Sequence, residues 1–258
     1  MTETKDLLFE VDHAVGIITL NREEKRNAIN GEIIELFNKY LDEIENNPAI
    51  RVVLITGAGD KVFCSGADLG GAIGGGTPVD SAMHYAKLLQ RMTNFSKPMV
   101  AKLNGHCLAG GMGLMLACDI VYAKENIKIG TPEVKVGLFP MMIGALIFKN
   151  ANRKKALEMI YTADLLPPEK AEQMGLITRV YQADELDQAV DSCLAKICRN
   201  APLAIQLGRQ AFAEVEDMPF EKALERLCHK LGEVIQTEDA MEGLAAFMQK
   251  RKPEWQGK

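Results

Sequence analysis

Two glycine-containing turns offer the first candidate chemistry, because each follows a strand-like run of residues. The first is residues 62–69 (VFCSGADL) and the second is residues 104–113 (NGHCLAGGMG). Glycine lets the backbone approach a ligand closely, and N–H groups at the start of a helix lack partners within it. Two such turns facing each other can hold an oxygen that develops negative charge. Taken alone, either turn fits close packing of a helix on a strand better, and neither matches a dinucleotide-binding or P-loop pattern.

A carboxylate, Glu133, closes the short segment GTPE at residues 130–133. Thr131 is a good N-cap, Pro132 suits the first position of a helix, and an acidic side chain in the first turn complements the helix dipole. These preferences explain the segment without catalysis. The lone histidines His84, His106 and His229 have no serine or aspartate partner at a recognisable spacing, and only His106 lies inside a glycine turn.

Strands alternating with helices are expected to position these turns. Residues 15–20, 52–56, 99–103 and 120–123 are apolar, strand-like runs, and residues 52–56 are expected to be buried on both faces. Between them, apolar residues recur at helical spacing, at Ile33, Phe37, Leu41 and Ile44. The sequence therefore predicts an α/β fold in the first half of the chain.

Three further segments leave alternatives open. The glycine-rich residues 70–78 are either a surface insertion or a lid beside a site. From residue 154 onward the pattern is nearly all helical, with apolar stripes on residues 186–197 and 241–248. Each stripe packs either on a neighbouring subunit or on the chain's own sheet.

The composition excludes several classes of protein. The 258 residues are 47% hydrophobic and 25% charged, with a net charge of -5, which argues against broad nucleic-acid binding. No apolar run is long enough to cross a membrane, and the first residues resemble neither a signal peptide nor a transit sequence. The six cysteines show neither paired nor zinc-ligand spacing, so we expect reduced thiols, no metal site and a cytoplasmic protein.

Ordered motifs extend along almost the whole chain. They are LNR at 20–22, KRNA at 25–28, TGAGDKVFCSGADL at 56–69, KP at 97–98, NG at 104–105, GG at 110–111, ACDI at 117–120, PEVKVGL at 132–138, AEQMGLI at 171–177 and FMQKRKP at 247–253. In this order they resemble the crotonase, or enoyl-CoA hydratase/isomerase, superfamily. The resemblance implies a crotonase-like α/β spiral of ββα units in residues 1–200 and a C-terminal helical trimerisation region in residues 201–258. It also implies a homotrimer or homohexamer.

The resemblance further implies a substrate and its binding site. The substrate would be an acyl-CoA thioester, with coenzyme A entering as part of it and no tightly bound cofactor. The backbone N–H groups of Ala67 and Gly110 would hold the thioester oxygen, and Glu133 would act as acid and base. The residues expected to contact coenzyme A are Lys25, Arg26, Ala28, Asp68, Leu69 and, from an adjacent subunit, Lys250.

Two positions depart from the hydratase pattern. Gly113 stands where family hydratases carry a second glutamate, and residues 139–144 (FPMMIG) replace a glycine-rich stretch. One carboxylate suffices to move a proton between carbons, which is isomerase chemistry. The expected activity is hydration of 2-enoyl-CoA, with double-bond isomerisation, decarboxylation or thioester hydrolysis as alternatives. A non-catalytic acyl-CoA-binding subunit is the alternative of another class.

Overall fold

A six-stranded sheet forms the centre of the computed structural model, which describes residues 5–68 and 77–258. The strand order is β1-β2-β3-β5-β7-β9. The strands are β1 (Leu7–Asp12), β2 (Val15–Leu20), β3 (Val52–Gly57), β5 (Met99–Leu103), β7 (Ile120–Lys124) and β9 (Arg179–Tyr181). Only β1 runs antiparallel to its neighbour; the other pairs are parallel. The four strands expected from the sequence are confirmed.

A second, smaller sheet of three parallel strands carries the two glycine turns. It consists of β4 (Val62–Cys64), β6 (His106–Leu108) and β8 (Ile129–Gly130), in that order. Each of these strands follows a strand of the large sheet after a short connection. Helix α2 (Pro78–Thr93) follows β4, and helix α3 (Gly110–Leu116) follows β6. The result is the predicted repetition of ββα units.

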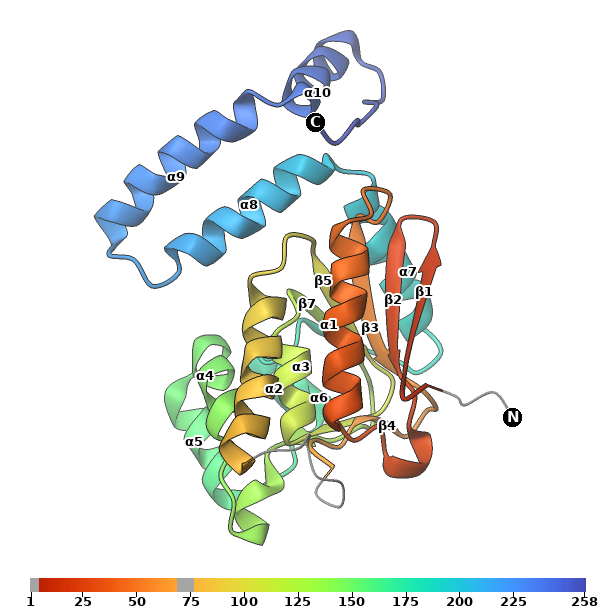
Figure 1. Cartoon of the computed structure of the whole chain (residues 1–258), viewed down its shortest axis with the longest axis vertical. Helices are drawn as coiled ribbons and strands as arrows, with labels where there is room; N and C mark the ends of the chain where they lie inside the picture. Colours follow the sequence, from red (N-terminus) through yellow and green to blue (C-terminus); the bar gives the residue numbers. More distant parts are fainter. Residues whose placement is uncertain (1–4, 69–76) are drawn as a thin grey trace.

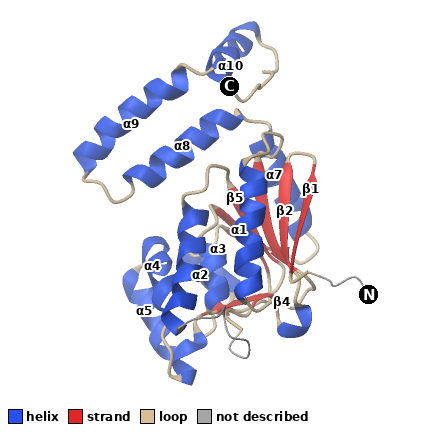
Figure 2. Ribbon diagram, viewed as in Figure 1, coloured by secondary structure: helices blue, strands red, loops and turns tan. Residues whose placement is uncertain are grey.

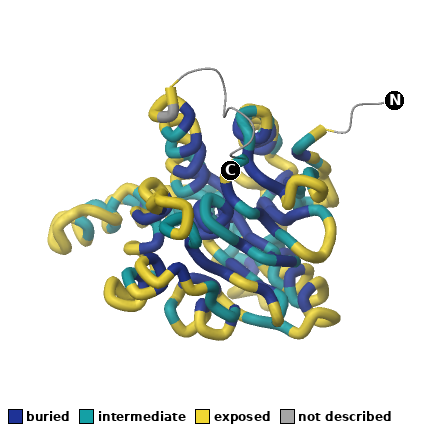
Figure 3. Tube along the Cα trace, turned by 90° about the horizontal axis from the view of Figure 1, so that it is seen from below, coloured by how far each residue is buried: buried dark blue, intermediate teal, exposed yellow. Residues whose placement is uncertain are grey.

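Strand β3 is buried on both faces, as expected from its continuous apolar run. Val53 and Ile55 belong to the core beneath helices α1 (Gly31–Glu45), α2 and α3. Val52 and Leu54 pack instead with the buried residues of helix α7 (Leu186–Cys198). Figure 2 shows α1 and α2 on one side of the sheet and α7 on the other, and Figure 3 shows the buried residues gathered at the centre. The residue 186–197 stripe therefore covers the chain's own sheet.

Short helices complete the core. They are the 3-10 helices η1 (Glu23–Lys25) and η2 (Pro132–Val136) and the α-helices α4 (Met141–Asn150), α5 (Arg153–Thr162) and α6 (Pro168–Gln173). Beyond residue 154 the chain is helical, as predicted, except for β9. No helix in the described ranges is long and apolar enough to cross a membrane.

The last three helices extend away from the large sheet (Figure 1). They are α8 (Pro202–Val215), α9 (Phe220–Ile235) and α10 (Glu238–Gln249). The C-terminal tail ties this region together, because the buried Asp239 carboxylate accepts the N–H of Gln256 at 2.7 Å, and the Trp255 indole donates to the Arg199 carbonyl at 2.7 Å. The apolar stripe of α10 stays exposed, with Leu244 63% and Met248 77% accessible. It therefore does not cover the chain's own sheet.

Candidate active site

The two glycine turns meet at the ends of β4 and β6. These strands are neighbours, and Cys64 pairs with Cys107 across them. A Cβ atom at Gly66 would lie 2.9 Å from the nitrogen of Gly110, and a Cβ atom at Gly110 would lie 3.4 Å from the nitrogen of Ala67. Such close approach leaves no room for a side chain at Gly66. The structure thus brings the Ala67 and Gly110 nitrogens close together.

Neither of these two N–H groups is used by a protein acceptor in the part of the chain that is described. The neighbours of Ala67 are paired: Ile29 donates its N–H to the Gly66 carbonyl at 2.8 Å, and Asp68 donates its N–H to the Ile29 carbonyl at 2.8 Å. Backbone N–H groups in folded proteins are almost always satisfied by protein, water or ligand. Two adjacent, unused donors can therefore receive one ligand oxygen.

The backbone around these donors adopts sparsely populated conformations. Gly66 has φ +100°, and Ala109 has φ 48° and ψ -129° although it carries a side chain. Backbone strain of this kind costs about 1–3 kcal/mol per residue and is concentrated at functional sites. In this chain the strained residue is Ala109, directly before the donor Gly110, whereas glycine allows the positive φ at Gly66, directly before Ala67, without this cost.

Glu133 reaches the same region from the third strand of the small sheet. The Ala109 N–H donates to the Gly130 carbonyl at 2.9 Å, so β8 delivers the chain to η2 beside the second glycine turn. The Oε2 atom of Glu133 is buried and has no hydrogen-bond partner among the described residues. Burial raises the pKa of Glu133 above its ordinary value, and the residue's own backbone N–H opposes the rise. A carboxyl group whose pKa is raised in this way is better able to hold and return a proton.

The capping role expected of Thr131 is wrong. Its side chain makes no cap hydrogen bond, and its Oγ1 atom is buried without a partner in the described structure. Pro132 does occupy the first turn, but the helix is a five-residue 3-10 helix, η2. Local helix preferences therefore account for Pro132 and for the acidic Glu133 in the first turn, but not for the buried Thr131 hydroxyl.

Gly113 lies inside helix α3, and the space beside it is filled. A Cβ atom at Gly113 would lie 2.5 Å from the Tyr85 hydroxyl oxygen and 2.7 Å from Cγ2 of Ile143. No second carboxylate can therefore project from this position without moving its neighbours. The second departure from the hydratase pattern is the segment at residues 139–144. Its Met141 side chain is 71% exposed, so it does not fill core space.

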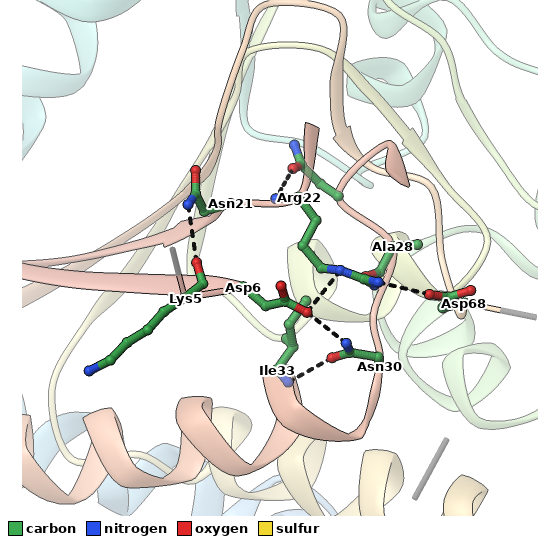
Figure 4. Close-up of polar contacts among 9 residues, drawn as sticks. Lys5, Asp6, Asn21, Arg22, Ala28, Asn30, Ile33 and Asp68 are labelled. Atoms are coloured by element: carbon green, nitrogen blue, oxygen red, sulfur yellow. Dashed lines mark hydrogen bonds and ion pairs between the residues drawn. The ribbon is translucent and has the colours of Figure 1, made fainter. Parts of the chain in front are cut away.

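Arg22 joins two of the segments expected to contact coenzyme A (Figure 4). Its guanidinium group donates to the Ala28 carbonyl at 2.8 Å and pairs with Asp68 at 3.0 Å and with Asp6 at 2.9 Å. The Arg22 side chain is only 11% exposed. Sequence reasoning missed this role, because an arginine after a strand gives no signal of a partner 46 residues away.

The other residues expected to contact coenzyme A do not all lie at this site. Lys25 and Arg26 are exposed on the turn before Ala28, and the Arg26 carbonyl accepts the Ser65 N–H at 3.1 Å. Leu69 lies outside the described residues, as does most of the glycine-rich segment 70–78. Lys250 follows α10, at the end of the molecule opposite β4 (Figure 1), so it does not join this site within one chain.

His106 lines a groove of about 1030 Å³ that Arg26 also lines. The groove is lined by Glu23, Glu24, Arg26, Asp60, Lys61, Val62, His106, Lys124, Glu125, Asn126, Ile127 and Ala183. The His106 Nδ1 atom accepts the Lys128 N–H at 2.9 Å. His84 and His229 are exposed. No histidine, cysteine or carboxylate cluster in the described ranges has the arrangement of a metal site, and all six cysteines are free thiols.

Comparisons with known proteins show the family and the fold that this chain shares. A family model described as enoyl-CoA hydratase/isomerase matches residues 10–258. The chain is 31% identical to the short-chain-enoyl-CoA hydratase of Clostridium acetobutylicum over 98% of both chains. It is 33% identical to the (E)-benzylidenesuccinyl-CoA hydratase of Thauera aromatica, over 96% of this chain and 98% of that protein. The structure of an enoyl-CoA hydratase from Bacillus anthracis matches with a TM-score of 0.92 at 29% identity, over 98% of this chain and 100% of that one.

Proposed function

The chain belongs to the enoyl-CoA hydratase/isomerase family, and from this premise we propose that it hydrates 2-enoyl-CoA thioesters. The observation that carries the proposal is the pair of adjacent, unused N–H groups at Ala67 and Gly110, which suits a thioester oxygen. Preorganised donors aimed at an oxygen that gains negative charge lower the barrier, and each contributes about 2.7–4 kcal/mol. The substrate class is supported by the names of the relatives.

Glu133 supplies the proton transfers in this proposal. Its carboxylate removes a proton from water as the water oxygen bonds to C3 of the enoyl group. The C2–C3 π electrons move toward the carbonyl, and the thioester becomes an enolate whose oxygen is held by Ala67 and Gly110. Glu133 then returns the proton to C2, which completes the addition of one water. A single carboxylate can perform both transfers when the water and C2 lie on the same face of the substrate.

Double-bond isomerisation is a second candidate, and the filled space beside Gly113 favours it. In a 3-enoyl-CoA, Glu133 would remove a proton from C2, and the same two donors would hold the enolate. The proton would then be returned to C4, which moves the double bond into conjugation. This reaction needs no water and no second carboxylate.

The binding of coenzyme A is proposed along the edge formed by Ala28 and Asp68, which Arg22 holds together. Leu69 would extend this edge, and Lys25 and Arg26 are placed to approach the phosphate groups. We propose a homotrimer or homohexamer, with Lys250 of a neighbouring subunit near the nucleotide. The exposed stripe on α10 supports an assembly, and the free thiols suit the cytoplasm.

Mass spectrometry in heavy water tests the proposed function. The protein is incubated with 2-enoyl- and 3-enoyl-CoA substrates of several chain lengths. A product heavier by one water supports hydration, whereas deuterium incorporation with migration of the double bond supports isomerisation. If neither occurs at any chain length, the proposal is wrong, and decarboxylation, thioester hydrolysis and simple binding are tested next.

A further inference from the structure

Tyr85 is the polar side chain that fills the volume beside Gly113, although it lies in another helix. It belongs to α2, is 7% exposed, and its hydroxyl donates a hydrogen bond to the carbonyl of Gly110. In an α-helix the Gly110 carbonyl and the Leu114 N–H would pair with each other. The Tyr85 hydroxyl therefore donates to a carbonyl in the first turn of α3.

Gly113 makes this placement possible. A Cβ atom there would come within 2.5 Å of the Tyr85 hydroxyl oxygen and within 3.1 Å of Cδ1 of Leu89, which belongs to the same helix as Tyr85. Real Cβ contacts of 2.5 Å do not occur, so any side chain at position 113 would displace the phenol. The glycine and the tyrosine are thus a matched pair, and the replaced glutamate position contains a neutral hydroxyl group.

The hydrogen bonds around Gly110 show what the phenol does. On one side of Gly110, the Ala109 N–H donates to Gly130 at 2.9 Å and the Ala109 carbonyl accepts from Met112 at 2.9 Å. On the other side, the Gly110 carbonyl accepts from Tyr85. Both peptide groups that flank Gly110 are therefore fixed, while its N–H has no acceptor in the described structure. A donor fixed in this way needs no reorganisation when charge develops on the substrate.

We propose that Tyr85 is a positioning residue of the oxyanion hole: its hydroxyl holds the Gly110 peptide so that the Gly110 N–H points at the thioester oxygen. This inference rests on the proposed function and deepens it, because it assigns a role to the polar group that occupies the space beside Gly113. Tyr85 acts through Gly110 and not as a base. Burial raises the pKa of Tyr85 well above its ordinary range, with the Cys64 and Cys107 thiols adding to the rise, so the phenol stays protonated.

Tyr85→Phe removes the hydroxyl and keeps the ring. We expect kcat for 2-enoyl-CoA to fall about 10- to 100-fold, since small misplacements of catalytic groups carry costs of this order. The dissociation constant for coenzyme A should stay within about threefold of the wild-type value, because most of the CoA contacts are made elsewhere. A conjugated dienoyl-CoA bound to the variant should also show a smaller red shift in absorbance, because its carbonyl group is less polarised.

Tyr40→Phe is the matched control. The Tyr40 hydroxyl is also buried and also donates to a backbone carbonyl, that of Leu7 at 3.2 Å, but it lies between α1 and β1. We expect it to lower Tm by an amount similar to Tyr85→Phe while leaving kcat and the dienoyl spectrum unchanged. Gly113→Ala tests the same contact from the other side, because the new Cβ atom displaces the Tyr85 hydroxyl. It should lower kcat and reduce the red shift of the bound dienoyl-CoA, as Tyr85→Phe does.

The outcomes separate the inference from the function on which it rests. A wild-type protein that neither turns over enoyl-CoA nor binds the dienoyl thioester overturns the proposed function and the inference with it. An active wild type whose Tyr85→Phe variant keeps both its kcat and its red shift overturns the inference alone. Equal losses of kcat in Tyr85→Phe and Tyr40→Phe, in proportion to Tm, would also overturn it, because the effect would then be general destabilisation.

Discussion

The Tyr85 hydroxyl oxygen lies 2.5 Å from the position that a Cβ atom of Gly113 would take. These residues come from α2 and α3, and their contact leaves no room for a carboxylate side chain at position 113. With the phenol in place, Glu133 is the single carboxylate with a buried, unpartnered oxygen atom in the described part of the chain. The departure of Gly113 from the hydratase pattern is therefore built into the packing and is not a simple deletion of a side chain.

Gly113→Glu tests this packing relationship. We expect a loss of about 1–3 kcal/mol of stability and no gain in hydration, because the new side chain overlaps Tyr85 and Ile143. The double variant Tyr85→Ala/Gly113→Glu should recover part of the lost Tm, since the overlapping phenol is gone. Thermal unfolding and steady-state hydration assays provide the measurements. A Gly113→Glu variant with wild-type Tm and faster hydration would contradict the packing argument.

An amide-to-ester replacement at residue 67, with lactic acid in place of alanine, tests the first donor. It removes the Ala67 N–H and retains the methyl side chain. This N–H has no acceptor within the described residues, but the ester weakens the Gly66 carbonyl that accepts the Ile29 N–H, so we expect a small loss of Tm. We expect kcat to fall about 100- to 1000-fold. The same replacement at Asp68, with the corresponding hydroxy acid, is the contrast: it removes an N–H that donates to Ile29, so it should lower Tm. Unchanged kcat in the residue-67 ester would exclude this N–H from the oxyanion hole.

The raised pKa of Glu133 predicts how stability depends on pH. Its pKa in the folded protein lies above the ordinary value of 4.5, because burial disfavours the carboxylate. As pH rises, the unfolded state loses this proton first, so Glu133 contributes stability below 4.5 that is lost as pH rises through the folded-state pKa. Glutamine does not titrate. The Tm of wild type minus that of Glu133→Gln should therefore fall as pH rises above 4.5; a constant or increasing difference would contradict a raised pKa.

Arg22→Lys tests the link between the two edges of the proposed CoA site. Lysine cannot reproduce the three directed contacts of the guanidinium group to Asp6, Ala28 and Asp68. We expect a loss of about 1–3 kcal/mol in the free energy of unfolding. KM for the thioester should rise more than kcat falls, because Ala28 and Asp68 are proposed to bind coenzyme A and not to react. Lys25→Arg, on the exposed turn nearby, is the control and should leave Tm unchanged.

Much of the fold could be predicted because its signals are local. The apolar run at β3 indicated burial on both faces, and Val52 to Ile55 alternate between two packed layers as expected. It could also be predicted that the two glycine turns face each other, because each turn follows a parallel strand. Ala67 and Gly110 were named for the site from motif resemblance and lie close together in the structure.

The parts that could not be predicted depend on contacts between distant segments. Tyr85 is one of several large residues on α2, and only the packed structure shows its hydroxyl at Gly110, 25 residues away. Arg22 likewise gave no sign of its pairing with Asp68. For Thr131 the local signal in the sequence was clear but wrong. The residue fits a helix-capping pattern, yet its hydroxyl is buried and does not cap η2. Tertiary packing overrides local preference at each of these positions.

The most direct test of the central claim compares wild type with Glu133→Gln in turnover of 2-enoyl- and 3-enoyl-CoA, with coenzyme A binding measured on both proteins. If Glu133 is the acid and base of an enolate-forming enzyme, the variant should lose about 100- to 10,000-fold in kcat. It should bind coenzyme A within about threefold of wild type, since Glu133 is placed at the acyl group. Wild-type turnover in the variant would contradict the assigned role. Binding without turnover in either protein, across all chain lengths, would instead identify a non-catalytic acyl-CoA-binding subunit.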